Sequence, residues 1–221
     1  MLVGDRMSHH PVTAGPEMPI NEALQLMKDR KVRRLPVLDK RGHLVGIVSE
    51  KDLLNAAPSS ATTLSVWELN YLISRITVAD VMTKNVLTVG EFTPIEEAAC
   101  IMADKKIGGL PVIREGRLIG IITETDIFKT FIEMLGAREK ALRVSLLIPE
   151  EPGILANVTG AVTKLGGNIV SLGTFLGEDA SNRTVTLKVR DVDKDKLVKQ
   201  MESMGITVLG IRETTGGACT T

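Results

Sequence analysis

The first three-fifths of the chain contain almost the same sequence twice, and this duplication constrains the fold more than any other feature. Residues 5–8, Asp-Arg-Met-Ser, return as residues 80–83, Asp-Val-Met-Thr, at a spacing of 80 − 5 = 75 residues. One residue is then lost from the second copy, after which residues 44–52 match residues 118–126. Two copies followed by a segment of different pattern predict a closed pseudo-twofold pair with clefts between its halves, not an open solenoid.

Composition excludes several classes of partner. The chain has 221 residues, 43% of them hydrophobic, which is typical of one or two globular domains. Lys and Arg number 27, as do Asp and Glu, and aromatic residues make up 3%, so we expect neither a nucleic-acid nor a membrane partner. No apolar run approaches the roughly 20 residues that span a bilayer, and no signal peptide is evident, so we expect a cytoplasmic protein.

Each copy predicts the order strand, helix, strand, strand, helix. In the first copy, apolar residues three and four apart indicate an amphipathic helix over residues 19–28, with proline at its start. Two apolar runs, residues 34–38 and 44–49, are joined by a Gly-containing turn and indicate a hairpin, and a second helix begins at Glu50. The second copy follows the same course to about residue 135.

The segments outside the two copies have patterns of their own. Between the copies, a short helix is expected over residues 64–76, and Trp67 and Tyr71 on it either pack into the core or dock a partner. The last third predicts strand, helix, strand, strand, helix, strand, which is the ferredoxin-like βαββαβ order. Residues 214–221 carry nothing to pack, and we expect a disordered tail there.

A hydroxyl residue followed three positions later by a carboxylate ends the second strand of each hairpin. These pairs are Ser49 with Asp52 and Thr123 with Asp126. One interpretation is structural, because this spacing is close to a capping box that satisfies free N–H groups at a helix start. The other is functional, because a helix N-terminus favours a phosphate and a nearby carboxylate accepts the two hydroxyls of a ribose.

The duplicated pattern resembles a tandem pair of CBS domains, the Bateman module, over about residues 3–135. The shared residues are the Met-Ser/Thr, Leu-Pro-Val and Gly-Ile-Val/Ile-Ser/Thr-Glu-x-Asp motifs of both copies. The resemblance implies a fold of mixed α/β or α+β class and a binding site for AMP, ADP, ATP or S-adenosylmethionine in the clefts. It also implies roles for ten residues at or around the ribose, phosphate and base: Asp52, Asp126, Ser49, Thr123, Val12, Thr13, Leu87, Thr88, Pro36 and Pro111.

The copies differ in charge just before Leu-Pro-Val. Arg33 and Arg34 stand there in the first copy, where the second has Gly108 and Gly109. Guanidinium groups pair with phosphate through two hydrogen bonds, so the two arginines are candidate phosphate ligands of one cleft. The alternative is that they form a solvated entrance to the strand.

The last third resembles an ACT domain. Residues 151–155, Glu-Pro-Gly-Ile-Leu, and residues 166–169, Gly-Gly-Asn-Ile, carry this likeness. It implies either pairing with a second ACT domain or binding of an amino acid or similar effector, for which Gly153 and Asn168 are candidates. The combined order is similar to that of bacterial acetoin-utilisation accessory proteins. The expected divisions are a first CBS domain at 1–57, a linker helix at 58–79, a second CBS domain at 80–136, an ACT domain at 142–213 and the tail.

Residues for catalysis are not evident in the sequence. The three histidines lie in a loop and a turn without a cysteine or carboxylate cluster, and Cys100 and Cys219 have no zinc-ligand spacing. We therefore expect no metal, no resident cofactor and no enzyme. The expected function is a homodimeric regulatory protein that senses an adenosyl ligand. The alternative is a ligand-free scaffold that presents the linker helix or the ACT edge to a partner.

Overall fold

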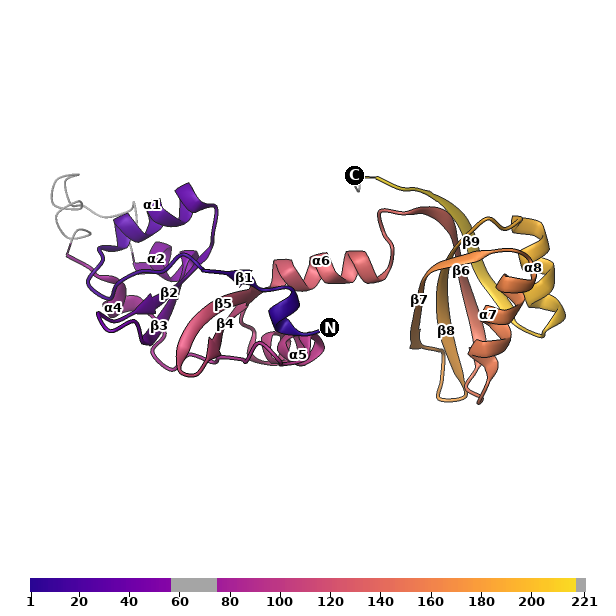
Figure 1. Cartoon of the computed structure of the whole chain (residues 1–221), viewed down its shortest axis with the longest axis horizontal. Coiled ribbons are helices and arrows are strands. Elements are labelled where there is room, and N and C mark those ends of the chain that lie inside the picture. Colours follow the sequence, from indigo (N-terminus) through magenta and orange to yellow (C-terminus); the bar gives the residue numbers. More distant parts are fainter. Residues whose placement is uncertain (57–74, 218–221) are drawn as a thin grey trace. The chain divides into compact units, whose positions relative to one another are not determined.

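The computed structural model describes residues 1–56 and 75–217 (Figure 1). The chain divides into two compact units, Met1–Ile127 and Phe128–Thr221. The expected helix that carries Trp67 and Tyr71 lies outside the described residues. Within the described part of the chain, no helix is long and apolar enough to cross a membrane.

The first copy has the predicted helices and hairpin, but the strand expected before them is reduced to an isolated bridge between Ala14 and Val37. Helix α1 (Ile20–Arg30) precedes the antiparallel hairpin of β2 (Arg34–Leu38) and β3 (Leu44–Ser49), and α2 (Glu50–Ala56) follows at once. The strand bounds are those expected from the apolar runs. The buried face of α1 places Ile20, Ala23 and Met27 in the core, at the three-and-four spacing that predicted the helix.

The second copy repeats this arrangement. Helix α5 (Ile95–Lys105) precedes β4 (Gly109–Arg114) and β5 (Arg117–Thr123), and α6 (Glu124–Met134) follows. The missing residue shortens the hairpin turn to Glu115 and Gly116, which both have positive φ (50° and 77°). Two such residues in a row are typical of a tight type I′ turn, so the deletion is absorbed without moving the strands out of register.

Each copy is completed by a segment that precedes the other one. The 3₁₀ turn η1 (Val3–Asp5) places Val3 in the core of the second copy, and β1 (Ser8–His9) pairs with β5. The short helix α4 (Val78–Val81) places Val78 in the core of the first copy, and Thr83 then pairs with Ile47 of β3. This exchange ties the two copies into a single unit.

Two glycines permit this exchange at equivalent places. A Cβ atom added at Gly46 would lie 2.3 Å from Sδ of Met82, and one added at Gly120 would lie 2.4 Å from Sδ of Met7. Neither glycine has positive φ, so the need is for space and not for backbone freedom. The methionine at the start of each exchanged segment, Met7 or Met82, therefore packs directly on the backbone of the other copy.

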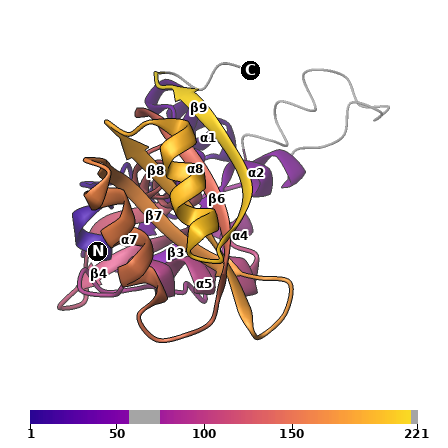
Figure 2. The ribbon, with the colours of Figure 1, turned by 90° about the vertical axis from the view of Figure 1, so that its right-hand side faces the viewer.

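The second unit is a four-stranded antiparallel sheet with two helices on one face (Figure 2). The order along the chain is β6 (Lys140–Pro149), α7 (Ile154–Lys164), β7 (Asn168–Leu176), β8 (Asn182–Arg190), α8 (Lys194–Ser203) and β9 (Thr207–Thr215). In the sheet the strands lie in the order β7-β8-β6-β9. This is the predicted βαββαβ fold. Its core contains Leu146, Val162, Leu187 and Met201, all fully buried.

The open face of this sheet carries polar contacts to the segment before β6. Lys188 is only 6% exposed and donates from Nζ to the carbonyl of Gly136 at 2.7 Å, and Ser171 donates to the carbonyl of Leu135 at 3.0 Å. At the other end of the unit, β9 extends to Thr215, two residues into the expected tail. The hydroxyl of Thr214 donates to the carbonyl of Ala141 at 2.9 Å, which gives this strand end a partner that its sequence does not indicate.

Candidate functional site

Ser49 and Asp52 form a compact hydrogen-bonded pair where β3 passes into α2. The backbone N–H and the hydroxyl of Ser49 donate to Oδ2 of Asp52 at 2.9 and 2.6 Å, and the N–H of Asp52 lies 3.3 Å from the Ser49 hydroxyl. This is the reciprocal geometry of a capping box. Both donors use the same oxygen, so within the described part of the chain Oδ1 of Asp52 receives no hydrogen bond. The structural role thus leaves one carboxylate oxygen available for another donor.

Thr123 and Asp126 repeat this pair at the start of α6. The N–H and the hydroxyl of Thr123 donate to Oδ2 of Asp126 at 2.9 and 2.7 Å. The two carboxylates therefore have equivalent positions in the two copies, as the duplicated motif predicts.

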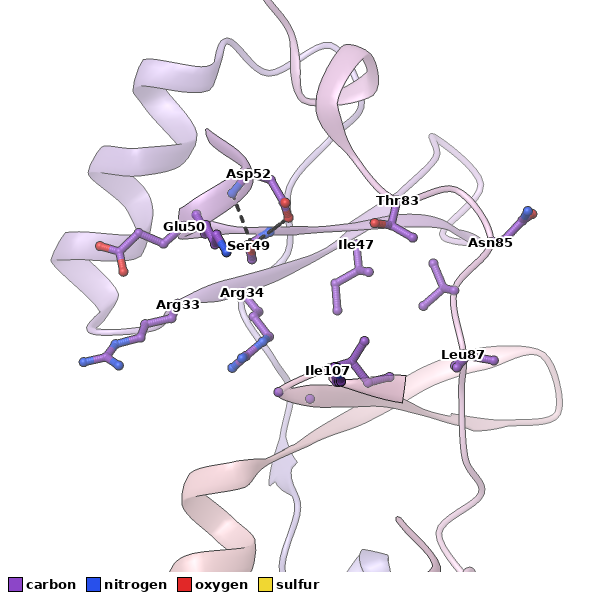
Figure 3. A pocket seen from close by; sticks show the side chains of 15 residues that line it. Arg33, Arg34, Ile47, Ser49, Glu50, Asp52, Thr83, Asn85, Leu87 and Ile107 are labelled. Atoms are coloured by element: carbon purple, nitrogen blue, oxygen red, sulfur yellow. Dashed lines mark hydrogen bonds between the residues drawn. The ribbon is translucent and has the colours of Figure 1, made fainter. Parts of the chain in front are cut away.

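A cavity of about 470 Å³ lies beside Asp52, between the two copies of the first unit (Figure 3). Its volume is within the usual range for small-molecule sites, about 300–1,000 Å³. The lining residues come from the start of β2, the junction of β3 and α2, the segment after α4 and the start of β4. They are Arg33, Arg34, Ile47, Ser49, Glu50, Lys51, Asp52, Thr83, Asn85, Val86, Leu87, Lys106, Ile107, Gly108 and Gly109.

The lining is chemically divided. Figure 3 shows the two arginines on one side of the cavity and Ile47, Ile107 and Leu87 extending toward the other. Four cationic side chains, those of Arg33, Arg34, Lys51 and Lys106, face two carboxylates, those of Glu50 and Asp52. The cavity thus combines an apolar side, a carboxylate that can accept hydrogen bonds from sugar hydroxyls, and a cationic side. These are the features that a base, a ribose and a phosphate require.

Five of the twelve residues expected around the nucleotide line this cavity: Arg33, Arg34, Ser49, Asp52 and Leu87. Thr123 and Asp126 form their own pair and are not among its lining residues. Pro36 and Pro111 are buried in β2 and β4, where their carbonyls accept from Ala14 and Val89. Those bonds hold the extended segments that carry Val12, Thr13 and Thr88 against the two hairpins. These five residues do not line the cavity either.

The sequence contrasts Arg33 and Arg34 of the first copy with Gly108 and Gly109 of the second. In the structure these four residues line the same cavity, together with Lys106, because the segments at the starts of β2 and β4 face each other there. The two arginines and the two glycines therefore form two walls of one site, and they do not distinguish one site from another.

Several lining residues were not expected from the sequence. Thr83 and Asn85 lie on the segment that follows α4, and Thr83 forms an isolated bridge with Ile47 of β3. Only the exchange of segments between the copies brings them beside Asp52. The matching Ser8 and Thr83 at the start of the two copies were the available signal, but their equivalence does not say which copy each residue joins.

The second unit holds a smaller cavity of about 190 Å³ at the start of α7, with Gly153, Glu150, Thr174 and Arg183 in its lining. Gly153 is the N-cap of α7 and has a φ of 84°, a conformation that favours glycine. Asn168 lies at the start of β7, beyond the other end of that helix. An 11-residue helix is about 16 Å long, so the two candidate effector residues lie far apart within one chain.

Among the described residues, no group of three or more His, Cys, Asp and Glu side chains could hold a metal ion. Cys100 is free and exposed on α5. The charged and polar groups that line the cavity beside Asp52 are suited to recognition by charge and hydrogen bonding.

Comparison with protein families divides the chain as its fold does. A family model for the CBS domain matches residues 3–59 and 78–133, and a model for the TTHA0829-like ACT domain matches residues 141–212. A CBS domain-containing protein of Dictyostelium discoideum is 32% identical over 136 residues, which are 61% of this chain and 94% of that protein. The L-aspartate semialdehyde sulfurtransferase of Methanocaldococcus jannaschii is 31% identical over 131 residues, 59% of this chain but only 23% of the enzyme.

Solved structures are similar to the first unit. A protein of Vibrio cholerae described as an acetoin utilization protein (AcuB) is 34% identical, with a TM-score of 0.52, and the match covers 62% of this chain and 93% of that one. The CBS domain pair of protein MJ0100, in complex with 5′-methylthioadenosine and S-adenosyl-L-methionine, is 32% identical with a TM-score of 0.50. That match covers 59% of this chain and 95% of the other.

Proposed function

Because the chain belongs to the CBS domain family and carries an ACT domain after its CBS pair, we propose that it is a non-catalytic regulatory protein of the cytoplasm. Its CBS pair senses an adenine nucleotide or a related adenosyl ligand such as AMP, ADP, ATP or S-adenosylmethionine. The ACT domain adds oligomerisation, as a homodimer, or a second site for a small effector. The similar sulfurtransferase matches this chain over only 23% of its own length, so its CBS pair is one part of a longer chain.

The cavity beside Asp52 is the observation that carries this proposal. A carboxylate with one oxygen fixed by Ser49 presents its other oxygen toward donors, and the two hydroxyls of a ribose are donors of this kind. Ile47, Leu87 and Ile107 offer apolar contact to a base, and Arg33 and Arg34 offer paired N–H donors to a phosphate. The complex of the MJ0100 CBS pair with two adenosyl compounds supports the same ligand class.

Regulation follows from where the cavity lies. A ligand that contacts both copies shifts their relative arrangement only if it binds one arrangement better than another. A differential affinity of about 1–3 kcal/mol is the usual size of such a coupling. The segment from α6 to β6 connects the second copy to the ACT domain and is the covalent route for this signal.

Thermal-shift measurements test the proposal. We expect AMP, ATP, S-adenosylmethionine or 5′-methylthioadenosine to raise the Tm, because a ligand at 100 times its Kd stabilises the protein by about 2.7 kcal/mol. NADH and free amino acids serve as comparison compounds, and an amino acid that raises the Tm would identify an effector for the ACT domain. No shift with any adenosyl compound at millimolar concentration would contradict the proposal.

A ligand-free scaffold is the second candidate function, and the hydrogen bonds of the two motifs favour it. Oδ2 of Asp52 and of Asp126 is fully engaged in capping, which is enough to account for both motifs structurally. On this alternative the protein presents the edge of the ACT sheet or the linker segment to a partner. Stability would then fall on removal of either carboxylate while no adenosyl compound binds.

A further inference from the structure

Arg34 connects the two copies across the cavity. Its Nη2 lies 3.8 Å from Oε2 of Glu124, the first residue of α6. The same guanidinium lies directly over Gly108, where an added Cβ would be 1.7 Å from Nη2. Figure 3 shows the side chain extending from β2 toward the segment around Ile107. Because Gly108 of the second copy has no side chain, the Arg34 side chain of the first copy can pack against its backbone.

The pairing is one-sided. Glu50 occupies the position of Glu124 in the first copy, also as the first residue of a helix. The residue equivalent to Arg34 in the second copy is Gly109, so the second copy has no arginine at the position that could form the equivalent ion pair with Glu50. Among the described residues, Glu50 has no salt bridge, whereas Glu124 has Arg34.

The Arg34–Glu124 contact is weak enough to be exchanged. The side chains are 26% and 58% exposed, and an ion pair of this kind contributes at most about 1 kcal/mol. A phosphate offers a guanidinium two parallel hydrogen bonds and more negative charge than one carboxylate does. A phosphate entering the cavity therefore competes with Glu124 for a cation that already lines that cavity.

We propose that Arg34 distinguishes phosphorylated from neutral adenosyl ligands by exchanging Glu124 for the ligand phosphate. The inference depends on the proposed function, since it concerns the same cavity. A nucleoside phosphate releases Glu124 at the start of the helix that also carries Asp126, and a neutral nucleoside leaves the contact between the copies intact. Binding of a phosphate in this cavity therefore changes the contacts of the helix that carries the Thr123–Asp126 motif of the second copy.

Isothermal titration calorimetry with AMP and 5′-methylthioadenosine, on the full chain, tests this exchange. E124Q removes the competitor, so its affinity for AMP should rise about three- to fivefold while its affinity for 5′-methylthioadenosine stays unchanged. R34Q should lower AMP affinity about tenfold or more. In the R34Q background, E124Q should no longer affect AMP. If R34Q does not fold, R34K replaces it, because lysine keeps the positive charge but lacks the two parallel N–H donors of the guanidinium.

E50Q is the matched control. It removes one carboxylate from the cavity wall without touching the Arg34 contact, so any gain in AMP affinity should be the same with and without Arg34. An E124Q gain that persists in the R34Q background, or no gain in the wild-type background, would overturn the exchange while leaving adenosyl binding intact. Failure of the wild type to bind either compound would overturn the proposed function together with this inference.

Discussion

Ser49 donates two hydrogen bonds, from its backbone N–H and its hydroxyl, to a single carboxylate oxygen of Asp52. The same geometry joins Thr77 to Asp80, whose Oδ2 accepts from the N–H and the hydroxyl at 2.8 Å each. The two pairs have the same chemistry, but only the first lines the cavity. Asp80 therefore serves as a control that separates helix capping from ligand binding.

Replacement of Asp52 by asparagine should lower the affinity for the ligand strongly and the stability of the fold only slightly. The amide oxygen of D52N can still accept from Ser49, but the second terminal atom becomes a donor and no longer accepts a ribose hydroxyl. We expect affinity for 5′-methylthioadenosine to fall at least about tenfold, which corresponds to about 1.4 kcal/mol. Calorimetry on D52N and D80N measures this. A loss of affinity in D80N as large as that in D52N would mean that the carboxylate acts only through the fold.

The ionic strength of the buffer should affect phosphorylated ligands alone. Arg33, Arg34, Lys51 and Lys106 attract a phosphate, and exposed charges are screened beyond about 10 Å at 0.1 M salt and more strongly above that. Affinity for AMP should fall as salt rises from about 0.05 to about 0.5 M, while affinity for 5′-methylthioadenosine should change little. Equal salt dependence of the two ligands would place the phosphate away from the four cations.

Alanine at Gly46 or at Gly120 should destabilise the first unit. The new Cβ would meet Met82 or Met7 at 2.3 or 2.4 Å, and the backbone carbonyl of Thr83 or Ser8 lies at 3.2 or 3.1 Å behind it. Overpacking of this kind costs about 1–3 kcal/mol. Urea unfolding of the G46A and G120A variants measures this loss of stability. G15A is the control, because an added Cβ at Gly15 meets nothing within 4 Å. G116A is not suitable as a control, because Gly116 has a positive φ. Wild-type stability in both variants would contradict the exchange of segments between the copies.

Low pH should weaken the start of α4. The N–H and then the hydroxyl of Thr77, which donate to the carboxylate, hold the pKa of Asp80 below its usual value. A depressed folded-state pKa stabilises the protein above the unfolded pKa, and this contribution is lost as the pH falls through the folded value. The stability difference between wild type and D80N should therefore shrink as the pH is lowered from 6 to below about 4. A difference that is independent of pH would contradict this account.

Removal of the Lys188 amine should destabilise the second unit. K188M keeps much of the buried stem but leaves the carbonyl of Gly136 without its donor, which costs about 1–3 kcal/mol for a buried polar group. Arg190 lies on the same strand and contacts Glu139 at 3.9 Å with both side chains about half exposed, so R190M is the matched control. Chemical denaturation should show a clear loss for K188M and almost none for R190M, and equal losses would assign no special role to the buried amine.

Local patterns predicted most of the elements. The apolar runs at residues 34–38 and 44–49 have the bounds of β2 and β3, because an apolar run and the turn residues beside it are properties of the strands themselves. The Ser49–Asp52 pair could likewise be predicted, since its three-residue spacing is set by one helical turn. In the ACT domain the βαββαβ order followed from two amphipathic helices between apolar runs.

The arrangement around the cavity could not be predicted in this way. Thr83 joins β3 of the first copy and Arg34 contacts Glu124 of the second, and both contacts depend on how the copies exchange segments. Repeat spacing is the same whether a segment packs on its own copy or on the other, so it contains no information on this choice. The sequence shows Gly108 and Gly109 only as positions that lack a charge, whereas in the structure they leave room for the Arg34 side chain of the first copy.

A crystal structure of the full chain with AMP or 5′-methylthioadenosine tests the central claim most directly. The account predicts that the ribose hydroxyls lie within hydrogen-bond distance of Oδ1 of Asp52, with the base against Ile47, Leu87 and Ile107 and any phosphate beside Arg33 and Arg34. A complex in which the adenosyl group binds elsewhere, with solvent around Asp52, would contradict it.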